Sequence, residues 1–219
     1  MGDPHEIEDL AALRRVIGEP IPGLGLKNQS TISDEAREYI EHSPFLVLAT
    51  SDAEGRLDAS PKGDGPGFCL IEDERTLVIP DRPGNKLVYG LQNILANPRV
   101  GVIFMLPGTP ETVRVNGIAT LTADPDLLAR LAARGKPAVL AIRIQVEECF
   151  HHCAKAFLRS QLWKRPRSGR SSATTSPRNS TRRSRTTTAP ISDRTRARLA
   201  ARGSARRSRA RAALRASAR

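Results

Sequence analysis

Residues 80–86, PDRPGNK, bring two cations and an amide into a short connection between a strand-like run and a helix-like run. Arg82 can grip two phosphate oxygens in a fork, and Lys86 adds a point charge from the first helical turn. Asn85 can cap the helix or donate its amide, and a helix N-terminus favours an anion. These residue types predict a phosphate site, although a capped turn with a solvated Arg and Lys has the same composition.

A second polar segment, residues 59–65 (ASPKGDG), stands at the end of another strand-like run. Ser60 supplies a hydroxyl, Lys62 an ammonium group and Asp64 a carboxylate, with glycines that let a ligand approach the backbone closely. This combination predicts a cradle for the edge of a flat polar ligand, and the alternative is a loop rich in turn-forming residues. The glycine spacing matches neither a dinucleotide-binding fingerprint nor a P-loop.

A third cluster, residues 149–153 (CFHHC), has the soft ligands of a metal site. Structural zinc ligands usually come as pairs separated along the chain. At this spacing at most three of Cys149, His151, His152 and Cys153 could reach one ion, and the sequence has no second cluster. We therefore predict no metal, and interpret the cluster as a packed strand end near a dimer interface. No nucleophile–histidine arrangement for catalysis can be argued from the sequence.

The elements that would position these residues follow from hydrophobic periodicity and turn signals. The order is β-β-β-β-α-β-β-α-β, preceded by two helices, and its hairpins predict a small, mostly antiparallel α+β barrel. Ser33 and Asp124 are the predicted caps of two helices. Predicted helices cover residues 7–17, 34–42, 87–96 and 124–134, and predicted strands cover 45–50, 57–61, 68–71, 76–79, 100–106, 112–121 and 139–146.

The charge of the chain divides sharply at residue 164. Of 35 basic and 23 acidic residues, 17 Arg and one Asp lie in residues 165–219, which leaves that segment at +16 and the rest at −4. The segment has no aromatic residue and few aliphatic ones, so it is predicted to be a disordered tail. A gene read in the wrong frame would give the same composition. We divide the chain into a helix and linker (1–29), a globular domain (30–164) and this tail (165–219).

The cysteine content and the N-terminus indicate a compartment. Cys69, Cys149 and Cys153 are odd in number and unsuited to a disulfide framework, which favours reduced thiols and a cytoplasmic protein. The first ten residues are acidic and lack the apolar core of a signal peptide. No apolar run reaches the length of a membrane-spanning helix.

Three longer stretches together resemble a known family. FLVLATSDAEGRLDASPKGD, TLVIPDRPGNKLVYGLQNILANPRVGVIF and ETVRVNGIATL are similar to the pyridoxamine 5′-phosphate oxidase-related, FMN-binding split β-barrels. The similarity is greatest to a probable FMN-dependent subgroup in which SPKGD and DRPGNK both occur, and CFHHCAKAFLRSQLWK matches that subgroup too. It covers residues 30–164. The Arg-rich substrate clamp of the oxidase itself is not found, so pyridoxamine phosphate is not the expected substrate.

The resemblance implies a split β-barrel homodimer with FMN at the interface. It implies that Arg82, Asn85 and Lys86 hold the phosphate, and that the flavin ring is lined by Ser60, Pro61, Lys62 and Asp64. It implies further that Arg159, Ser160 and Trp163 complete the site from the partner chain. Lys62 near the pyrimidine end would stabilise the anionic reduced flavin.

Three classes of function follow from these readings. The first is an FMN-dependent oxidoreductase acting on an unknown small molecule. The second is a binding module that holds a flavin, the deazaflavin F420 or haem without turnover. The third is non-specific nucleic-acid binding through the tail, whose cations would engage phosphates but which has no aromatic residue for stacking on bases.

Overall fold

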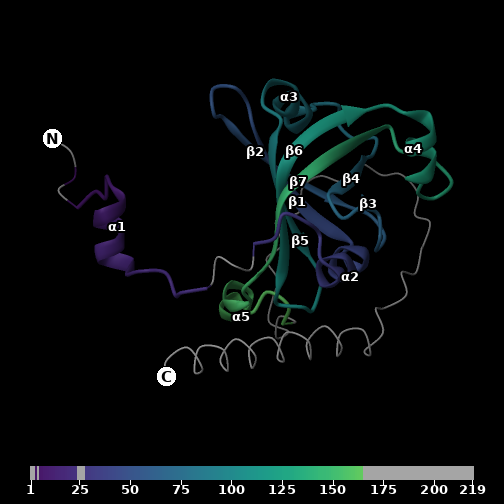
Figure 1. Cartoon of the computed structure of the whole chain (residues 1–219). Helices are drawn as coiled ribbons and strands as arrows, with labels where there is room; N and C mark the ends of the chain where they lie inside the picture. The colour runs from purple at the N-terminus through teal and green to yellow at the C-terminus, as the bar shows by residue number, and fades with distance from the viewer. Residues whose placement is uncertain (1–2, 4, 24–27, 165–219) are drawn as a thin grey trace, which may run out of the picture.

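The computed structural model describes residues 3, 5–23 and 28–164 (Figure 1). The predicted tail, residues 165–219, lies outside the described residues. Between residues 45 and 152 the elements follow the predicted β-β-β-β-α-β-β-α-β order. The helices are α1 (Leu10–Ile17), α2 (Asp34–His42), α3 (Tyr89–Ala96), α4 (Pro125–Arg130) and α5 (Lys155–Ser160), and the strands are β1 (Phe45–Ser51), β2 (Leu57–Gly63), β3 (Leu70–Asp73), β4 (Thr76–Asp81), β5 (Arg99–Met105), β6 (Thr112–Thr122) and β7 (Leu140–His152).

All seven strands form one antiparallel sheet in the order β2-β1-β5-β6-β7-β4-β3. Four strands lie between β2 and β4 in this order, yet Lys62 on β2 forms an ion pair with Asp81 on β4. The sheet must therefore curl back on itself, and Figure 1 shows β6 and β7 as its long curved wall. This confirms the predicted α+β split barrel.

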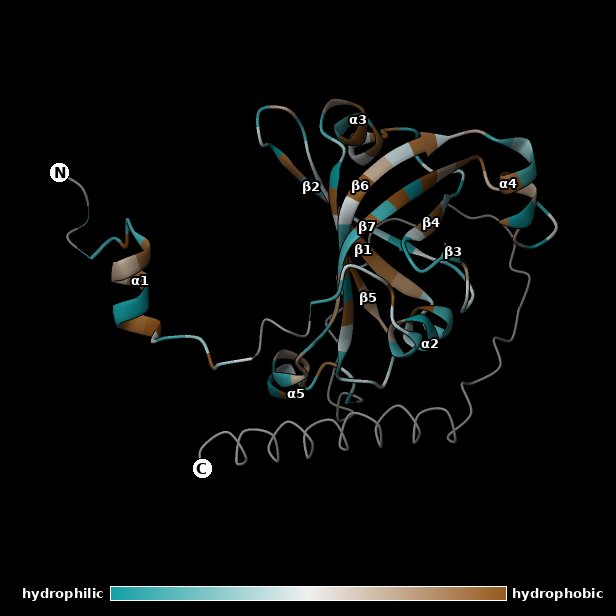
Figure 2. Cartoon of the chain, viewed as in Figure 1, coloured by the Kyte–Doolittle hydropathy of each residue, from teal (hydrophilic) through white to brown (hydrophobic). Residues whose placement is uncertain are grey.

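The interior of the barrel is filled by alternate residues of the strands. On β6 Val113, Val115, Gly117 and Ala119 are buried in strict alternation, and Thr112 at the start of the strand is buried as well. Gly117 stands beside a register shift between β6 and β7, and a Cβ there would lie 2.1 Å from the carbonyl oxygen of Gln145. Only glycine therefore fits this point of the pattern. Figure 2 shows the hydrophobic segments along β1 and β6.

Helix α2 closes one end of the barrel. The Oγ of Ser33 accepts a hydrogen bond from the Ala36 N–H at 3.3 Å, as its predicted cap role requires. Tyr39 and Ile40 on the inner side of the helix are 1% exposed and join the barrel core. The sequence 29–32 that leads into α2 is tied to β7, where Gln29 and Cys149 exchange both backbone hydrogen bonds.

Helix α4 covers the outer surface of β4 and β7. Its predicted cap is confirmed, since Asp124 Oδ1 accepts from the Asp126 and Leu127 N–H groups. The helix ends at Arg130 rather than at the predicted residue 134, because the chain enters a tight turn in which Arg134 and Gly135 both have positive φ. The helix closes a small second core composed of Val78, Leu127, Leu128, Leu131, Ala138 and Ala141.

Helix α1 is shorter than predicted and has no buried residue among the described part of the chain. Asp9 caps it by accepting from the Ala12 N–H at 2.6 Å, and Gly18 with φ 84° ends it. Neither α1 nor any other described helix has the length and apolarity needed to cross a membrane.

Candidate functional site

The two polar segments predicted from the sequence meet where β2 approaches β4. Lys62 Nζ lies 2.7 Å from Asp81 Oδ1, and both side chains are largely buried. Arg82 Nε donates to Asp64 Oδ2 at 3.1 Å, 18 positions away along the chain. We call these four residues, Lys62, Asp64, Asp81 and Arg82, the seam. The seam joins β2 to β4 and to the loop after β4 through side chains, because β2 and β4 form no backbone hydrogen-bond ladder with each other.

Arg82 has a second hydrogen-bond partner besides Asp64. Its Nη1 donates to the carbonyl oxygen of Leu131, the residue that follows α4, at 2.8 Å. The side chain is 25% exposed and that of Asp64 is 15% exposed. The alternative reading of Arg82 as a solvated turn residue is therefore wrong. The guanidinium fixes three parts of the fold: the end of β2, the loop after β4 and the end of α4.

The loop between β4 and α3 is as long as predicted, but it lies two residues further along the chain because β4 extends to Asp81. Helix α3 begins at Tyr89, two residues later than predicted, and its N-cap Val88 has φ 52° and no side-chain hydrogen bond. Lys86, with φ 63°, is exposed in the loop instead of lying in the first helical turn. Asn85 Oδ1 accepts from the Leu87 N–H at 3.0 Å, so it caps a turn within the loop and not the helix.

Strand β2 presents its predicted site residues to two different sides. Asp58, Ser60 and Lys62 are partly buried, whereas Ala59 and Pro61 are exposed. Successive side chains of a strand point to opposite faces, so Pro61 cannot line the same surface as Ser60 and Lys62 within one chain. The Ser60 hydroxyl donates to Asp58 Oδ2 at 2.5 Å and keeps its acceptor capacity.

Helix α3 rests on this face of β2 and on the end of β1. A Cβ on Gly90 would lie 3.1 Å from Asp58 Oδ2 and 3.5 Å from Ser60 Oγ, so the missing side chain allows the helix to approach. Asn93 donates to Thr50 Oγ1 at 3.1 Å and Asn97 to Ser51 Oγ at 2.8 Å. These bonds hold α3, and with it the end of the loop that carries Lys86.

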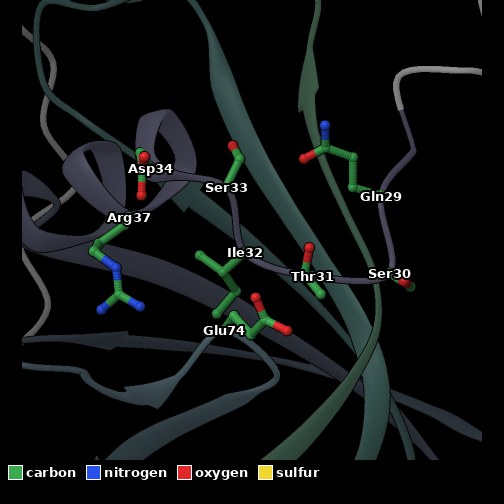
Figure 3. A pocket seen from close by; sticks show the side chains of 8 residues that line it. All are labelled: Gln29, Ser30, Thr31, Ile32, Ser33, Asp34, Arg37 and Glu74. Carbon is green, nitrogen blue, oxygen red and sulfur yellow. The ribbon is translucent and has the colours of Figure 1, made fainter.

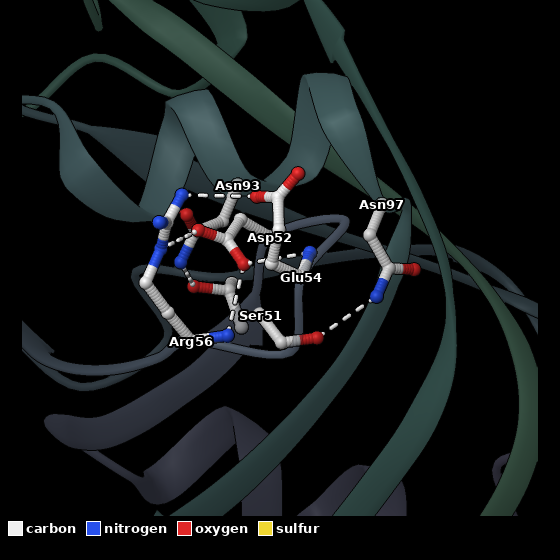
Figure 4. A network of polar contacts seen from close by, with 7 residues as sticks. Ser51, Asp52, Glu54, Arg56, Asn93 and Asn97 are labelled. Atoms are coloured by element: carbon white, nitrogen blue, oxygen red, sulfur yellow. Dashed lines mark hydrogen bonds and ion pairs between the residues drawn. The ribbon is translucent and has the colours of Figure 1, made fainter.

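The same network includes the β1–β2 hairpin (Figure 4). Asp52 Oδ1 accepts from the Glu54 and Arg56 N–H groups, and its Oδ2 pairs with Arg56 Nε at 2.6 Å. The Asp52 side chain thus organises the turn together with the backbone hydrogen bond from the Asp52 N–H to the Arg56 carbonyl oxygen and the Arg56–Glu54 ion pair.

The third group of predicted site residues lies elsewhere in the same chain. Trp163 donates from Nε1 to the Thr109 carbonyl oxygen at 2.9 Å and stacks on Phe157, with ring centroids 5.7 Å apart. Ser160 donates to the Phe157 carbonyl oxygen at 3.2 Å, and Arg159 is exposed. Figure 1 shows α5 on the side of the barrel away from α4, to which Arg82 is bound. One chain therefore does not bring α5 to the seam.

The cysteine–histidine cluster is divided by the alternation of β7. Cys149 and His151 face the interior, where burial raises the pKa of Cys149 to about 11 and lowers that of His151. Phe150 and His152 point outward and contact each other edge to face. No group of three or more His, Cys, Asp or Glu side chains is placed to hold a metal ion within residues 3, 5–23 and 28–164.

His151 belongs to a buried group under α2 that includes Tyr39, Leu106 and Glu111. The Tyr39 hydroxyl donates to the Glu111 carbonyl oxygen at 2.5 Å and accepts from the Leu106 N–H at 3.0 Å. Burial raises the pKa of Tyr39 well above its ordinary value. The His151 ring meets the Tyr39 ring edge-on at 5.9 Å, and its buried Nε2 has no hydrogen-bond partner among the described residues. We call these residues the Tyr39 end.

An open pocket of about 770 Å³ lies beside α2, away from every predicted site residue (Figure 3). Its lining includes the hydroxyls of Ser30, Thr31 and Ser33 together with Arg37 and Glu74. Charges of both signs and several hydroxyls give it no single ligand chemistry.

A family model described as pyridoxamine 5′-phosphate oxidase matches residues 32–153. No curated protein matches the chain. Among solved structures, the chain is similar to HupZ of Group A Streptococcus, at 19% identity and a TM-score of 0.45, over 55% of this chain and 93% of that one. It is also similar to an FMN-binding protein from Syntrophomonas wolfei (10% identity, TM-score 0.40, 56% and 83% covered) and to the haem storage protein HutZ from Vibrio cholerae (18%, 0.40, 54% and 93%).

Proposed function

Because the chain belongs to the pyridoxamine 5′-phosphate oxidase family, we propose that it binds FMN and acts as an FMN-dependent oxidoreductase on a small molecule. The observation that carries this proposal is the seam. Segments 60–64 and 80–86 belong to strands that are not neighbours in the sheet. Their side chains meet all the same, because Lys62 pairs with Asp81 and Arg82 pairs with Asp64.

The residues of the seam have donors left for an anionic ligand. Arg82 uses two of its five N–H groups, on Asp64 and Leu131, so three stay available. Lys62 uses one of its three N–H groups on Asp81. Lys86 is exposed, and none of the ion pairs between described residues involves it. This donor set suits a phosphate beside a polar ring edge.

Each side chain then has a part in binding. Arg82 and Lys86 hold the phosphate, and Asn85 donates its amide, since only its Oδ1 is used within the loop. Lys62 and Ser60 contact the polar edge of the ring. Asp64 acts mainly by orienting Arg82. When bound, FMN supplies the electron-transfer chemistry, and the protein orients and shields it.

The site requires a second chain in this proposal. Leu57 is 84% exposed and Leu95 is 77% exposed, and with Phe45 and Tyr89 they leave apolar surface on β1, β2 and α3 uncovered by any described residue. Apolar surface of this kind favours association. A homodimer would cover it and would bring Arg159, Ser160 and Trp163 of the second copy to the seam. The three free cysteines fit a cytoplasmic protein.

The test is a visible spectrum of the purified protein, followed by reduction with NADH or NADPH. The bands of an oxidised flavin, and FMN in the denatured supernatant, are expected. A haem or deazaflavin spectrum would show that the cofactor is not FMN. If no pyridine nucleotide or other donor reduces the bound flavin, the protein is a flavin carrier and not an enzyme. We further propose that residues 30–164 suffice, so truncation after Lys164 should keep the flavin and remove any affinity for nucleic acid.

A further inference from the structure

The turn between α4 and β7 carries an arginine that the sequence did not single out. Ala133 and Lys136 exchange both backbone hydrogen bonds, at 2.9 and 3.0 Å, around Arg134 and Gly135. Arg134 has φ 52°, a left-handed conformation that glycine adopts freely and side-chain-bearing residues adopt at a cost. Such positions persist where the surrounding structure or a function requires them.

Arg134 shares a carboxylate with Arg82. Its Nη2 lies 4.0 Å from Asp64 Oδ1, while Arg82 is bound to the other oxygen, Oδ2. The Arg134 side chain is 84% exposed, so the contact with Asp64 is weak and easily exchanged. An exposed cation with only a long contact to a carboxylate thus lies beside the residue proposed to hold a phosphate.

Charge balance gives this cation a role. Lys62 is neutralised by Asp81 and Arg82 by Asp64, so these two pairs carry no net charge. A phosphate monoester carries roughly −1.5 to −2 at neutral pH. Lys86 supplies one uncompensated charge in the loop after β4, and a second is needed to match the ligand.

We propose that Arg134 is a phosphate-binding residue that completes the site formed by Arg82 and Lys86. Its guanidinium exchanges the long contact with Asp64 for the phosphate oxygens of the bound cofactor. The ligand class is a flat molecule that carries a phosphate monoester, and the inference rests on the FMN site proposed above. The turn places the residue at the seam without help from a second chain.

Arg130 provides a matched control on the same helix–turn segment. It is four positions earlier, and its side chain is 58% exposed. Its Nη1 lies 3.7 Å from Glu72 Oε1 and is directed to β3 instead of the seam. Loss of either arginine changes the net charge equally. A difference in FMN affinity between the two variants therefore reports on the position of the arginine and not on the net charge.

The experiment compares Arg134→Gly, Arg134→Lys and Arg130→Gln with the wild type in titrations of FMN and riboflavin. Glycine suits the positive φ, so Arg134→Gly should keep the melting temperature of the cofactor-free protein. We expect it to weaken FMN binding roughly tenfold, the loss of one charged hydrogen bond. Riboflavin binding should not change, Arg134→Lys should recover part of the loss, and Arg130→Gln should bind both ligands as the wild type does.

Three results would overturn the inference, and they are distinguishable. If the wild type prefers FMN to riboflavin and Arg134→Gly keeps the full preference, Arg134 has no part in a site that exists. The same holds if Arg130→Gln loses as much as Arg134→Gly, because the effect would then be one of net charge. If the wild type itself binds FMN no better than riboflavin, phosphate recognition fails and the proposed function falls with it.

Discussion

The seam and the Tyr39 end both contain polar side chains in the wall of one barrel, but they satisfy them differently. At the seam, charged groups pair with charged groups, are partly exposed and keep donors to spare. At the Tyr39 end, a fully buried hydroxyl lies between two backbone groups, from Glu111 and Leu106. The side chains of the seam can therefore form hydrogen bonds with a ligand. The Tyr39 hydroxyl already uses its donor and an acceptor position within the protein, so a change there only removes hydrogen bonds.

This difference predicts that the two regions separate binding from stability. The ion pairs of the seam keep some exposure, so water compensates for part of their loss and their contribution to the free energy of unfolding is modest. A buried donor or acceptor left without a partner costs its full desolvation penalty. Variants at the seam should therefore change cofactor affinity most, and variants at the Tyr39 end should change stability most.

The largest effect is expected for Arg82→Ala. Loss of a charged hydrogen bond to phosphate should weaken FMN binding roughly ten- to hundredfold, without a matching loss for riboflavin. The variant should also unfold more easily by about 1 kcal/mol, because the Leu131 carbonyl oxygen and Asp64 lose their partner. Fluorescence quenching and urea unfolding measure the two quantities.

Arg99→Ala is the control for that variant. Arg99 pairs with Glu147 at 3.3 Å on the exposed surface and contacts no part of the seam. It should change neither measurement appreciably. Equal losses of FMN and riboflavin affinity in Arg82→Ala would show that Arg82 holds the fold and not the phosphate.

Tyr39→Phe should reverse the pattern. The ring keeps its packing, but the Leu106 N–H and the Glu111 carbonyl oxygen lose their partner inside the core. We expect the free energy of unfolding to fall by about 1–3 kcal/mol. FMN affinity, measured far below the melting temperature, should not change. A loss of FMN affinity with unaltered stability would contradict the prediction that the seam governs binding and the Tyr39 end governs stability.

Lys86→Ala sharpens the comparison within the loop itself. Lys86 is exposed and takes part in no ion pair between the described residues, unlike Arg82. Its removal should weaken FMN binding roughly tenfold and leave the urea midpoint where it is. A destabilised variant would mean that Lys86 has a structural contact that the exposed side chain does not suggest.

The smallest effect concerns the pH dependence of stability. Burial lowers the pKa of His151, so the native imidazole stays neutral while the unfolded chain takes up a proton below about pH 6.5. Stability should therefore fall as the pH falls through this value and towards the lower native pKa. His151→Phe should flatten the slope, leaving the weaker contribution of His152, whose pKa is lowered in the same direction by partial burial and by Arg114. An unchanged slope in urea unfolding at several pH values would contradict this origin.

The fold could be predicted from the sequence because its signals are local. Strand β6 alternates apolar and polar residues, Ser33 and Asp124 stand where helix caps must stand, and the hairpins have turn residues at their tips. The start of α3 could not be predicted, since Leu87, Val88 and Tyr89 look helical while Lys86 and Val88 adopt positive φ.

The candidate site was only half visible for a different reason. The residue types in segments 60–64 and 80–86 indicated polar chemistry, but the pairing of Arg82 with Asp64 depends on how far the sheet curls. Arg134 was hidden within a segment that we predicted to be the end of a helix. Its place beside Asp64 follows from a turn that replaces the last part of that helix.

Strand β2 is one of the two edges of the sheet, and Pro61 stands in its middle, opposite Val47 of β1. Proline has no N–H group, so a foreign strand that added to this edge would meet a gap in its ladder of hydrogen bonds. At the other edge β3 is only four residues long and ends in two acidic residues. Both edge strands of the sheet, β2 and β3, thus disfavour the addition of a further strand and the aggregation that would follow from it. Two copies that associate through β2 must do so by their side-chain faces, as separate sheets rather than as one continuous sheet.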